Sequence, residues 1–237
     1  MHLAVLMTNT DESDFAQVHP KDGEKFTRLI HLVRPTWQVT SFAAKDGVFP
    51  SNIADFDGVI ITGSPASVHE TDPWIGDLLQ TIRAAYAQKT PMFGACFGHQ
   101  AIALALGGNV EPNDDGWVFG LTESKITAKA EWMQGLPDTL LEYGAHIEQV
   151  TKLPAGAMAL STSKACNITG FRIADGVYTT QNHPEMTPSF IAALVAEYAP
   201  KLPLGVGEMA QASLARQVDA LPYAESIARF FEIKSPH

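Results

Sequence analysis

The chain has 237 residues, of which 46% are hydrophobic and 18% charged, and this length suits one large domain or two small ones. Its 16 Lys and Arg against 26 Asp and Glu give a formal net charge of −10, which disfavours nucleic acid or an anionic membrane as a partner. The apolar run at residues 3–8 is too short for a signal peptide or a membrane span and lacks a basic flank. We therefore expect a cytoplasmic protein.

Residues 1–108 alternate between short apolar runs and segments of helical periodicity. The runs at 3–8, 37–42, 57–65 and 91–95 are typical of buried strands. The segments 23–34, 72–88 and 97–108 are typical of amphipathic helices, the second with Asp72 as N-cap and Pro73 at the first helical position. This alternation predicts a parallel sheet with helices on both faces.

The pattern changes after residue 108 to short alternating strands. We expect strands at 159–163, 166–173 and 176–185, forming a small antiparallel sheet packed beside the first half. Helices are predicted at 188–199 and 208–233, the latter broken near Pro222. Because no linker divides the chain, we predict a single α/β domain over 1–237, with a core of about 1–195 and a helical extension of about 196–237. That extension would either contact another subunit or cover the sheet.

The stretch GACFG at residues 94–98 places Cys96 between a predicted strand and a predicted helix. Gly94 and Gly98 leave room for a sharp turn of the G-x-nucleophile-x-G type. The helix N-terminus would favour the Cys96 thiolate, and the Phe97 amide would be placed to bind an oxyanion. The alternative is a small apolar cysteine packed in a turn.

A base and a group that orients it are needed to decide between these interpretations. His183 follows a predicted strand, and Glu185 lies two residues on, where its carboxylate can reach the imidazole. Alone, this His would be interpreted as a surface residue in a turn; together with Cys96 it indicates an acid/base pair. A zinc site formed by Cys96, His99, His183 and Glu185 lacks a second matching pair of ligands, so we expect no metal.

Four further residues are candidates on weaker grounds. Gly63 and Ser64 end a strand that should neighbour the Cys96 strand, so one of their amides would complete an oxyanion hole, although Pro65 also fits a plain turn. His99, on the first turn of the helix, is interpreted as structural packing. His146 either lines the same cleft or lies on the surface.

The motifs GACFGHQ, ITGSPASV and NHPE, in this order, resemble those of the class I glutamine amidotransferase family, over about residues 1–195. The resemblance implies a flavodoxin-like fold, no cofactor, and cleavage of the glutamine side-chain amide through a cysteinyl thioester that water hydrolyses. By motif, Cys96 is the nucleophile, His183 the base and then the acid, and Glu185 its orienting group. The implied oxyanion donors are Phe97 and the Gly63–Ser64 turn, and the implied substrate-binding residues are Gln100, Tyr143 and His146.

The sequence departs from the family pattern in two places. Gly63–Ser64 stands where many members have Gly-Gly, which leaves open which amide faces the oxyanion. Glu148 stands where relatives often have Asp.

Two functions follow from the resemblance. The first is a free-standing glutaminase that supplies ammonia to a separate synthetase, since no synthetase domain follows in this sequence. The second is a stand-alone γ-glutamyl peptidase or transferase, with the loop from Thr10 to Gly23 helping to select the substrate. A third hypothesis, a catalytically silent binding module, is disfavoured by the intact triad.

Overall fold

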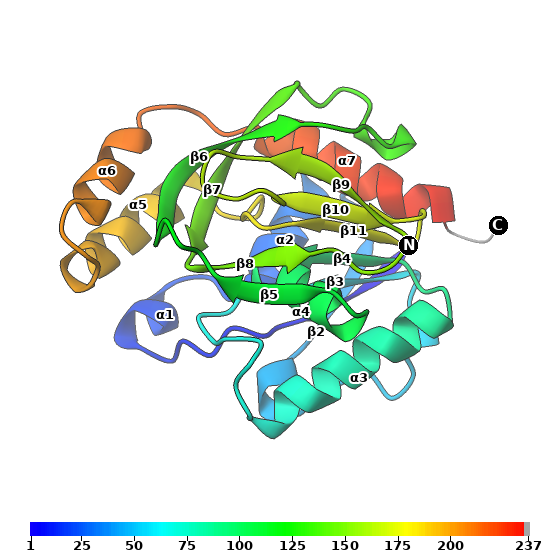
Figure 1. The fold of residues 1–237 in the computed structure, drawn as a ribbon. Helices are drawn as coiled ribbons and strands as arrows, with labels where there is room; N and C mark the ends of the chain where they lie inside the picture. The colour runs from blue at the N-terminus through cyan, green and yellow to red at the C-terminus, as the bar shows by residue number, and fades with distance from the viewer. Residues whose placement is uncertain (235–237) are drawn as a thin grey trace.

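The computed structural model describes residues 1–234 and shows one mixed sheet of nine strands with helices on both faces (Figure 1). The strand order is β2-β1-β3-β4-β11-β10-β9-β6-β7, and β5 and β8 form a separate antiparallel pair. The strands are β1 (His2–Leu6), β2 (Gln38–Phe42), β3 (Gly58–Ile61), β4 (Met92–Ala95), β5 (Asn109–Pro112), β6 (Val118–Ile126), β7 (Thr139–His146), β8 (Glu148–Lys152), β9 (Ala157–Thr162), β10 (Gly170–Ile173) and β11 (Val177–Thr180). The α-helices are α1 (Asp14–Val18), α2 (Asp22–His31), α3 (Pro73–Ala87), α4 (Phe97–Ala105), α5 (Pro188–Tyr198), α6 (Val206–Ser213) and α7 (Ala220–Lys234).

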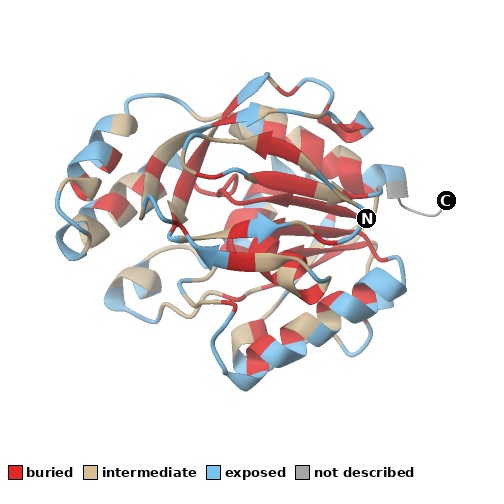
Figure 2. Cartoon of the chain, viewed as in Figure 1, coloured by how far each residue is buried: buried red, intermediate tan, exposed pale blue. Residues whose placement is uncertain are grey.

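Successive residues of a strand point to opposite faces of the sheet, and this alternation builds a core on each face. Ala4 and Leu6 of β1 pack in the cluster that includes α3 and α4, whereas Leu3 and Val5 pack in the cluster that includes α2 and α7. In Figure 1, α3 lies below the sheet and α7 above it, and Figure 2 shows the central strands buried along most of their length. The α/β fold class with helices on both faces is confirmed.

The parallel strands determine where functional side chains can meet. β1, β3, β4 and β11 run parallel, and the register pairs Ile61 with Gly94 and Ala95 with Thr180. The carboxyl ends of these strands therefore lie at one edge of the sheet, where open α/β sheets bind their ligands. The residues that follow, Gly63, Cys96 and His183, are brought together at this edge.

The second half of the chain differs from the prediction. Its strands were expected in a small separate sheet, but β11 pairs in parallel with β4, and β10, β9, β6 and β7 continue the same sheet in antiparallel order. The small antiparallel sheet is formed by β5 and β8 instead. The physical reason is that β11 is buried at all four positions, so it occupies the centre of the sheet rather than an edge.

The helical tail also differs in detail. The break in residues 208–233 falls between α6 and α7, before Pro222, which lies in the first turn of α7, where a missing backbone N–H costs no helical hydrogen bond. Helix α7 covers the face of the sheet to which Leu3 and Val5 of β1 point. It buries three side chains completely on that face: Ile227, Phe230 and Phe231. Asp72 is the N-cap of α3, but its side chain makes no capping hydrogen bond. Residues 235–237 of the predicted extension lie outside the described residues.

No helix within residues 1–234 is both long enough and apolar enough to cross a membrane.

Candidate active site

Cys96 lies in a strained turn between β4 and α4. Its φ of 50° and ψ of −108° are unusual for a residue with a side chain, and its amide donates to the Thr180 carbonyl at 2.9 Å. A Cβ on Gly94 would lie 2.7 Å from the Gly98 backbone, and a Cβ on Gly98 would lie 2.3 Å from the Ile61 carbonyl oxygen. The two glycines therefore permit the close approach of strand and helix that the turn requires.

His183 and Glu185 form a buried pair beside this turn. The His183 Nδ1 lies 2.8 Å from the Glu185 Oε1, and the His183 amide donates to the Tyr143 carbonyl at 2.8 Å. Burial alone would lower the pKa of His183, but the Glu185 carboxylate and the Cys96 sulfur outweigh burial and hold this pKa well above its ordinary value. The imidazole is thus oriented by one acidic group and in electrostatic contact with the sulfur.

The Gly63–Ser64 turn, which follows β3, lies against both Cys96 and His183. A Cβ on Gly63 would lie 2.7 Å from the His183 Cε1 and 3.4 Å from the Cys96 Cβ, so this glycine touches both residues. The Gly63 carbonyl accepts hydrogen bonds from the hydroxyls of Thr8 and Thr62. Because a trans peptide directs its N–H opposite to its carbonyl, the Ser64 amide points away from Thr8.

A buried polar network that sequence reasoning missed supports the segment that carries His183. The carboxylate of Glu142 in β7 accepts hydrogen bonds from the Thr180 hydroxyl at 3.0 Å and from the side-chain amide of Asn182 at 3.2 Å. Burial raises the pKa of Glu142 to about 7, and the hydrogen bonds oppose that rise. The sequence of β7, TLLEYGAH, has no regular alternation of apolar and polar residues, so no local signal marks this carboxyl as facing inward.

Three expected substrate-binding residues lie in the interior around the site rather than on its open cavity. The side-chain amide of Gln100 donates to the backbone carbonyl of Glu148 at 2.9 Å, and the His146 Nδ1 lies 3.0 Å from the same oxygen. Burial lowers the pKa of His146 to about 4, so this imidazole is neutral at pH 7. The Tyr143 side chain packs in an apolar cluster with Met186 and Ile191, and its contact with His183 is through the backbone.

His99 is fully buried in α4, with its Nδ1 2.8 Å from the Thr179 hydroxyl and its ring beside Phe171. Burial lowers its pKa to about 3. Among residues 1–234, no group of three or more His, Cys, Asp or Glu side chains is placed to hold a metal ion. Cys96 and Cys166 are both free and buried.

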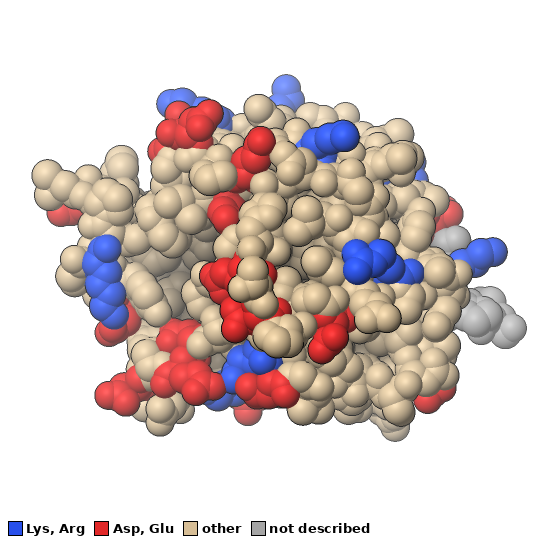
Figure 3. Space-filling model, turned by 60° about the horizontal axis from the view of Figure 1, so that its bottom comes forward, with Lys and Arg blue, Asp and Glu red and all other residues tan. Residues whose placement is uncertain are grey.

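A cavity of about 510 Å³ opens onto the His183–Glu185 pair and the Gly63–Ser64 turn. Its wall is formed largely by residues 9–22, with α1, and by residues 183–202, with α5; Trp117 and Phe119 also line it. Figure 3 shows a hollow on this face of the molecule, with acidic side chains gathered along one side of it. The loop predicted to help select a substrate thus borders the cavity.

Comparison with known proteins agrees with this geometry. The family model of glutamine amidotransferase class-I matches residues 28–193, most of the chain. The chain belongs to this family.

Two curated relatives are named for different activities. The chain is 30% identical over 162 residues to gamma-glutamyl peptidase 3 of Arabidopsis thaliana, which covers 65% of this chain and 65% of that protein. It is 32% identical over 139 residues to the glutamine-hydrolyzing GMP synthase of Pseudomonas aeruginosa, which covers 55% of this chain and 25% of that enzyme. The chain therefore matches less than two thirds of the length of either relative.

The fold is shared with a solved glutamine amidotransferase from Thermotoga maritima. The TM-score is 0.79 at 18% identity, and the match covers 98% of this chain and 97% of that one. The expected resemblance to class I glutamine amidotransferases is confirmed.

Proposed function

We propose that this class I glutamine amidotransferase hydrolyses γ-glutamyl amide bonds through a covalent thioester on Cys96. The observation that carries the proposal is the strained Cys96 turn next to His183, whose Nδ1 lies 2.8 Å from the Glu185 carboxylate. A nucleophile, a base and an orienting group in contact are the arrangement that activates a thiol.

The chemistry follows from these positions. His183 takes the thiol proton of Cys96, and the sulfur attacks the γ-carbonyl carbon of the substrate. His183, held as an imidazolium by Glu185, then gives this proton to the leaving nitrogen as the carbon–nitrogen bond breaks. Water, deprotonated by His183, attacks the thioester, and glutamate leaves as the thiol reforms.

The oxyanion of each tetrahedral intermediate needs hydrogen-bond donors near the position of the substrate's former carbonyl oxygen. The Phe97 amide, at the first position of α4, is one of the helical N–H groups without an intrahelical acceptor. Of the two amides in the Gly63–Ser64 turn, we assign the second donor to Ser64, because the Gly63 carbonyl of the same peptide is fixed by Thr8 and Thr62.

Two substrate classes fit this chemistry. Glutamine, with ammonia delivered to a separate synthetase, is the first candidate. γ-Glutamyl peptides or related conjugates are the second, and the cavity of about 510 Å³ favours them, because it falls within the range of ~300–1,000 Å³ that holds ligands larger than glutamine.

The test is hydrolysis of glutamine and of a panel of γ-glutamyl amides by the wild-type protein and by Cys96→Ala, with ammonia and released amine both measured. Cys166→Ala is the matched control, because Cys166 is also free and buried but its thiol donates to the Ile168 carbonyl. The proposal expects turnover to vanish in Cys96→Ala and to persist in Cys166→Ala. Undiminished turnover in Cys96→Ala would exclude the mechanism.

A further inference from the structure

We infer that the α1–α5 side of the cavity binds the leaving amine of the substrate, and that this amine is apolar, aromatic and without a carboxylate. The inference rests on the proposed γ-glutamyl amidase function and adds the class of leaving group. It is carried by the aromatic wall of the cavity and by the charges that line it.

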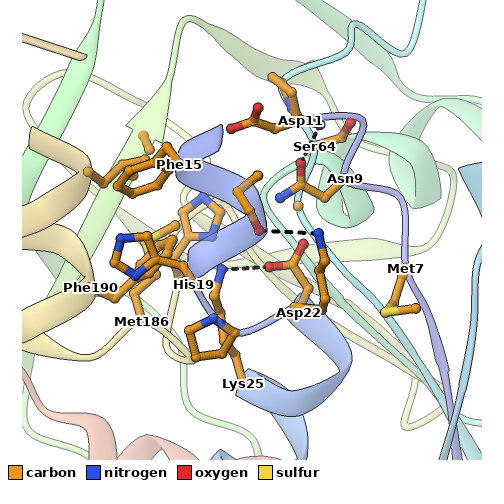
Figure 4. Close-up of a pocket in the computed structure, with 18 of the residues that line it drawn as sticks. Met7, Asn9, Asp11, Phe15, His19, Asp22, Lys25, Ser64, Met186 and Phe190 are labelled. Atoms are coloured by element: carbon orange, nitrogen blue, oxygen red, sulfur yellow. Dashed lines mark hydrogen bonds and ion pairs between the residues drawn. The ribbon is translucent and has the colours of Figure 1, made fainter. Parts of the chain in front are cut away.

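The wall is an aromatic cluster formed by Phe15, His19, Phe190 and Tyr198. The ring of Phe15 lies 4.3 Å from that of His19 and 5.9 Å from that of Phe190, measured between centroids, and its edge contact with Tyr198 spans 6.3 Å. In Figure 4, Phe15, His19, Phe190 and Met186 gather on one side of the cavity, and Asn9, Asp11 and Ser64 lie on the other. Phe15, His19, Phe190 and Tyr198 are each partly exposed and line the cavity, so a ring can stack on them.

The position of this wall relative to the reacting groups assigns it to the leaving group. Met186 follows Glu185 directly in the chain, Phe190 lies in the first turn of α5, and both line the same cavity as His183 and Glu185. His183 delivers its proton to the leaving nitrogen in the proposed mechanism, so the substituent on that nitrogen lies on the His183 side. The wall formed by Met186 and Phe190 is then the surface this substituent meets.

The charge of the lining opposes an added carboxylate. Five carboxylates, Asp11, Glu12, Asp22, Asp46 and Glu185, line the cavity against three lysines, Lys21, Lys25 and Lys45. Counting Glu185 with His183 as a neutral pair still leaves an acidic excess. Two of the lysines are already paired: Lys25 lies 2.8 Å from Asp22 and 3.7 Å from the Phe190 ring centroid, and Lys45 contacts Glu12 and Asp46.

This charge balance separates two kinds of leaving group. The glutamyl end of every substrate is a zwitterion, whose ammonium and carboxylate cancel. An amino acid joined through its nitrogen adds one further carboxylate, which meets repulsion in the acidic lining. An aromatic amine without that group gains the same ring contacts without the repulsion.

The test compares γ-glutamylphenethylamide with γ-glutamylphenylalanine, which differs from it only by the carboxylate, and with γ-glutamylethylamide, which lacks the ring. We expect kcat/KM for the phenethylamide to exceed that for each of the others by about tenfold or more. Phe15→Ala and Phe190→Ala should each lower the ratio of phenethylamide to ethylamide by about tenfold. Val18→Ala is the matched control on α1, since Val18 is 78% exposed and lies outside the cavity, and it should leave this ratio unchanged.

Binding of the same three compounds to Cys96→Ala, followed by calorimetry, makes the inference independent of turnover. The same order of affinity is expected. Equal or better binding of γ-glutamylphenylalanine, or no gain from the ring, would overturn the inference. Cys96-dependent cleavage without a ring preference would refute only this inference, whereas cleavage that persists in Cys96→Ala would refute the proposed function.

Discussion

Gly63→Ala is the most informative single change, because it adds one methyl group at the point where Gly63 touches both reacting residues. The new Cβ would lie 2.7 Å from the His183 Cε1, whereas ordinary van der Waals contact begins at 3.4 Å. Either the imidazole retreats by most of that difference or the turn moves. Both movements disturb the His183 ring relative to the Cys96 sulfur.

The expected magnitude follows from the size of this displacement. A misplacement of ~1 Å at a reacting centre can lower the rate by roughly 10²-fold. We therefore expect kcat/KM for γ-glutamyl amide hydrolysis to fall by roughly 10²-fold in Gly63→Ala. The assay is steady-state release of ammonia or amine, with thermal unfolding measured on the same samples to show that the protein is folded.

Gly76→Ala is the matched control, because a Cβ at Gly76 on α3 meets nothing within 4 Å. We expect unchanged activity and a gain of up to about 1 kcal/mol in the free energy of unfolding, since alanine favours a helix over glycine. Activity in Gly63→Ala within twofold of wild type, with its fold intact, would refute the contact geometry of the site.

Further predictions concern the charged and titratable groups. Glu185→Gln should lower kcat by roughly 10²-fold or more, because the imidazolium of His183 loses its carboxylate partner. Glu197→Gln is the control: Glu197 forms a surface ion pair with Lys201, and its loss should not change kcat. Equal kcat values for the two variants in steady-state assays would contradict the role of the His183–Glu185 pair. Burial lowers the pKa values of His146 and His99 to about 4 and about 3. Below pH 6.5 the unfolded chain therefore binds protons at these two histidines that the folded chain does not bind. The free energy of unfolding, measured in urea, should fall as pH drops from 6.5 through 4 towards 3. A pH-independent stability over that window would contradict their burial. Burial raises the pKa of Glu142 from 4.5 to about 7, so its protonated form stabilises the fold below pH 4.5 and this contribution is lost as pH rises through 7. This contribution of about 3 kcal/mol opposes that of the two histidines, so in Glu142→Gln stability should fall more steeply as pH drops from 7 to 4.5. An unchanged slope in denaturant titrations would refute this.

The Cys96 turn was predictable because its signals are local. Gly94 and Gly98 flank the cysteine, and each fills a position where the structure leaves no space for a Cβ. The relation of His183 to Glu185 was likewise readable, since the two residues lie only two positions apart in sequence. Their placement beside Cys96 followed only from the resemblance to the family and from the expected parallel sheet.

The parts that sequence reasoning missed depend on contacts between distant segments. Nothing local in residues 176–185 indicates that β11 would pair with β4, although this pairing brings His183 to Cys96. The buried contacts of Glu142 with Thr180 and Asn182 likewise join residues about forty positions apart. The aromatic wall needs Phe15 and Phe190, which are brought together only by the packing of α1 on α5.

The covalent step on Cys96 can be tested directly by mass spectrometry. The protein is mixed with a γ-glutamyl amide, quenched in acid during turnover and digested, and the peptides containing Cys96 and Cys166 are weighed. A γ-glutamyl adduct on the Cys96 peptide alone, which disappears as substrate is exhausted, is the predicted result. Turnover without any adduct on this peptide, together with full activity in Cys96→Ala, would contradict the account.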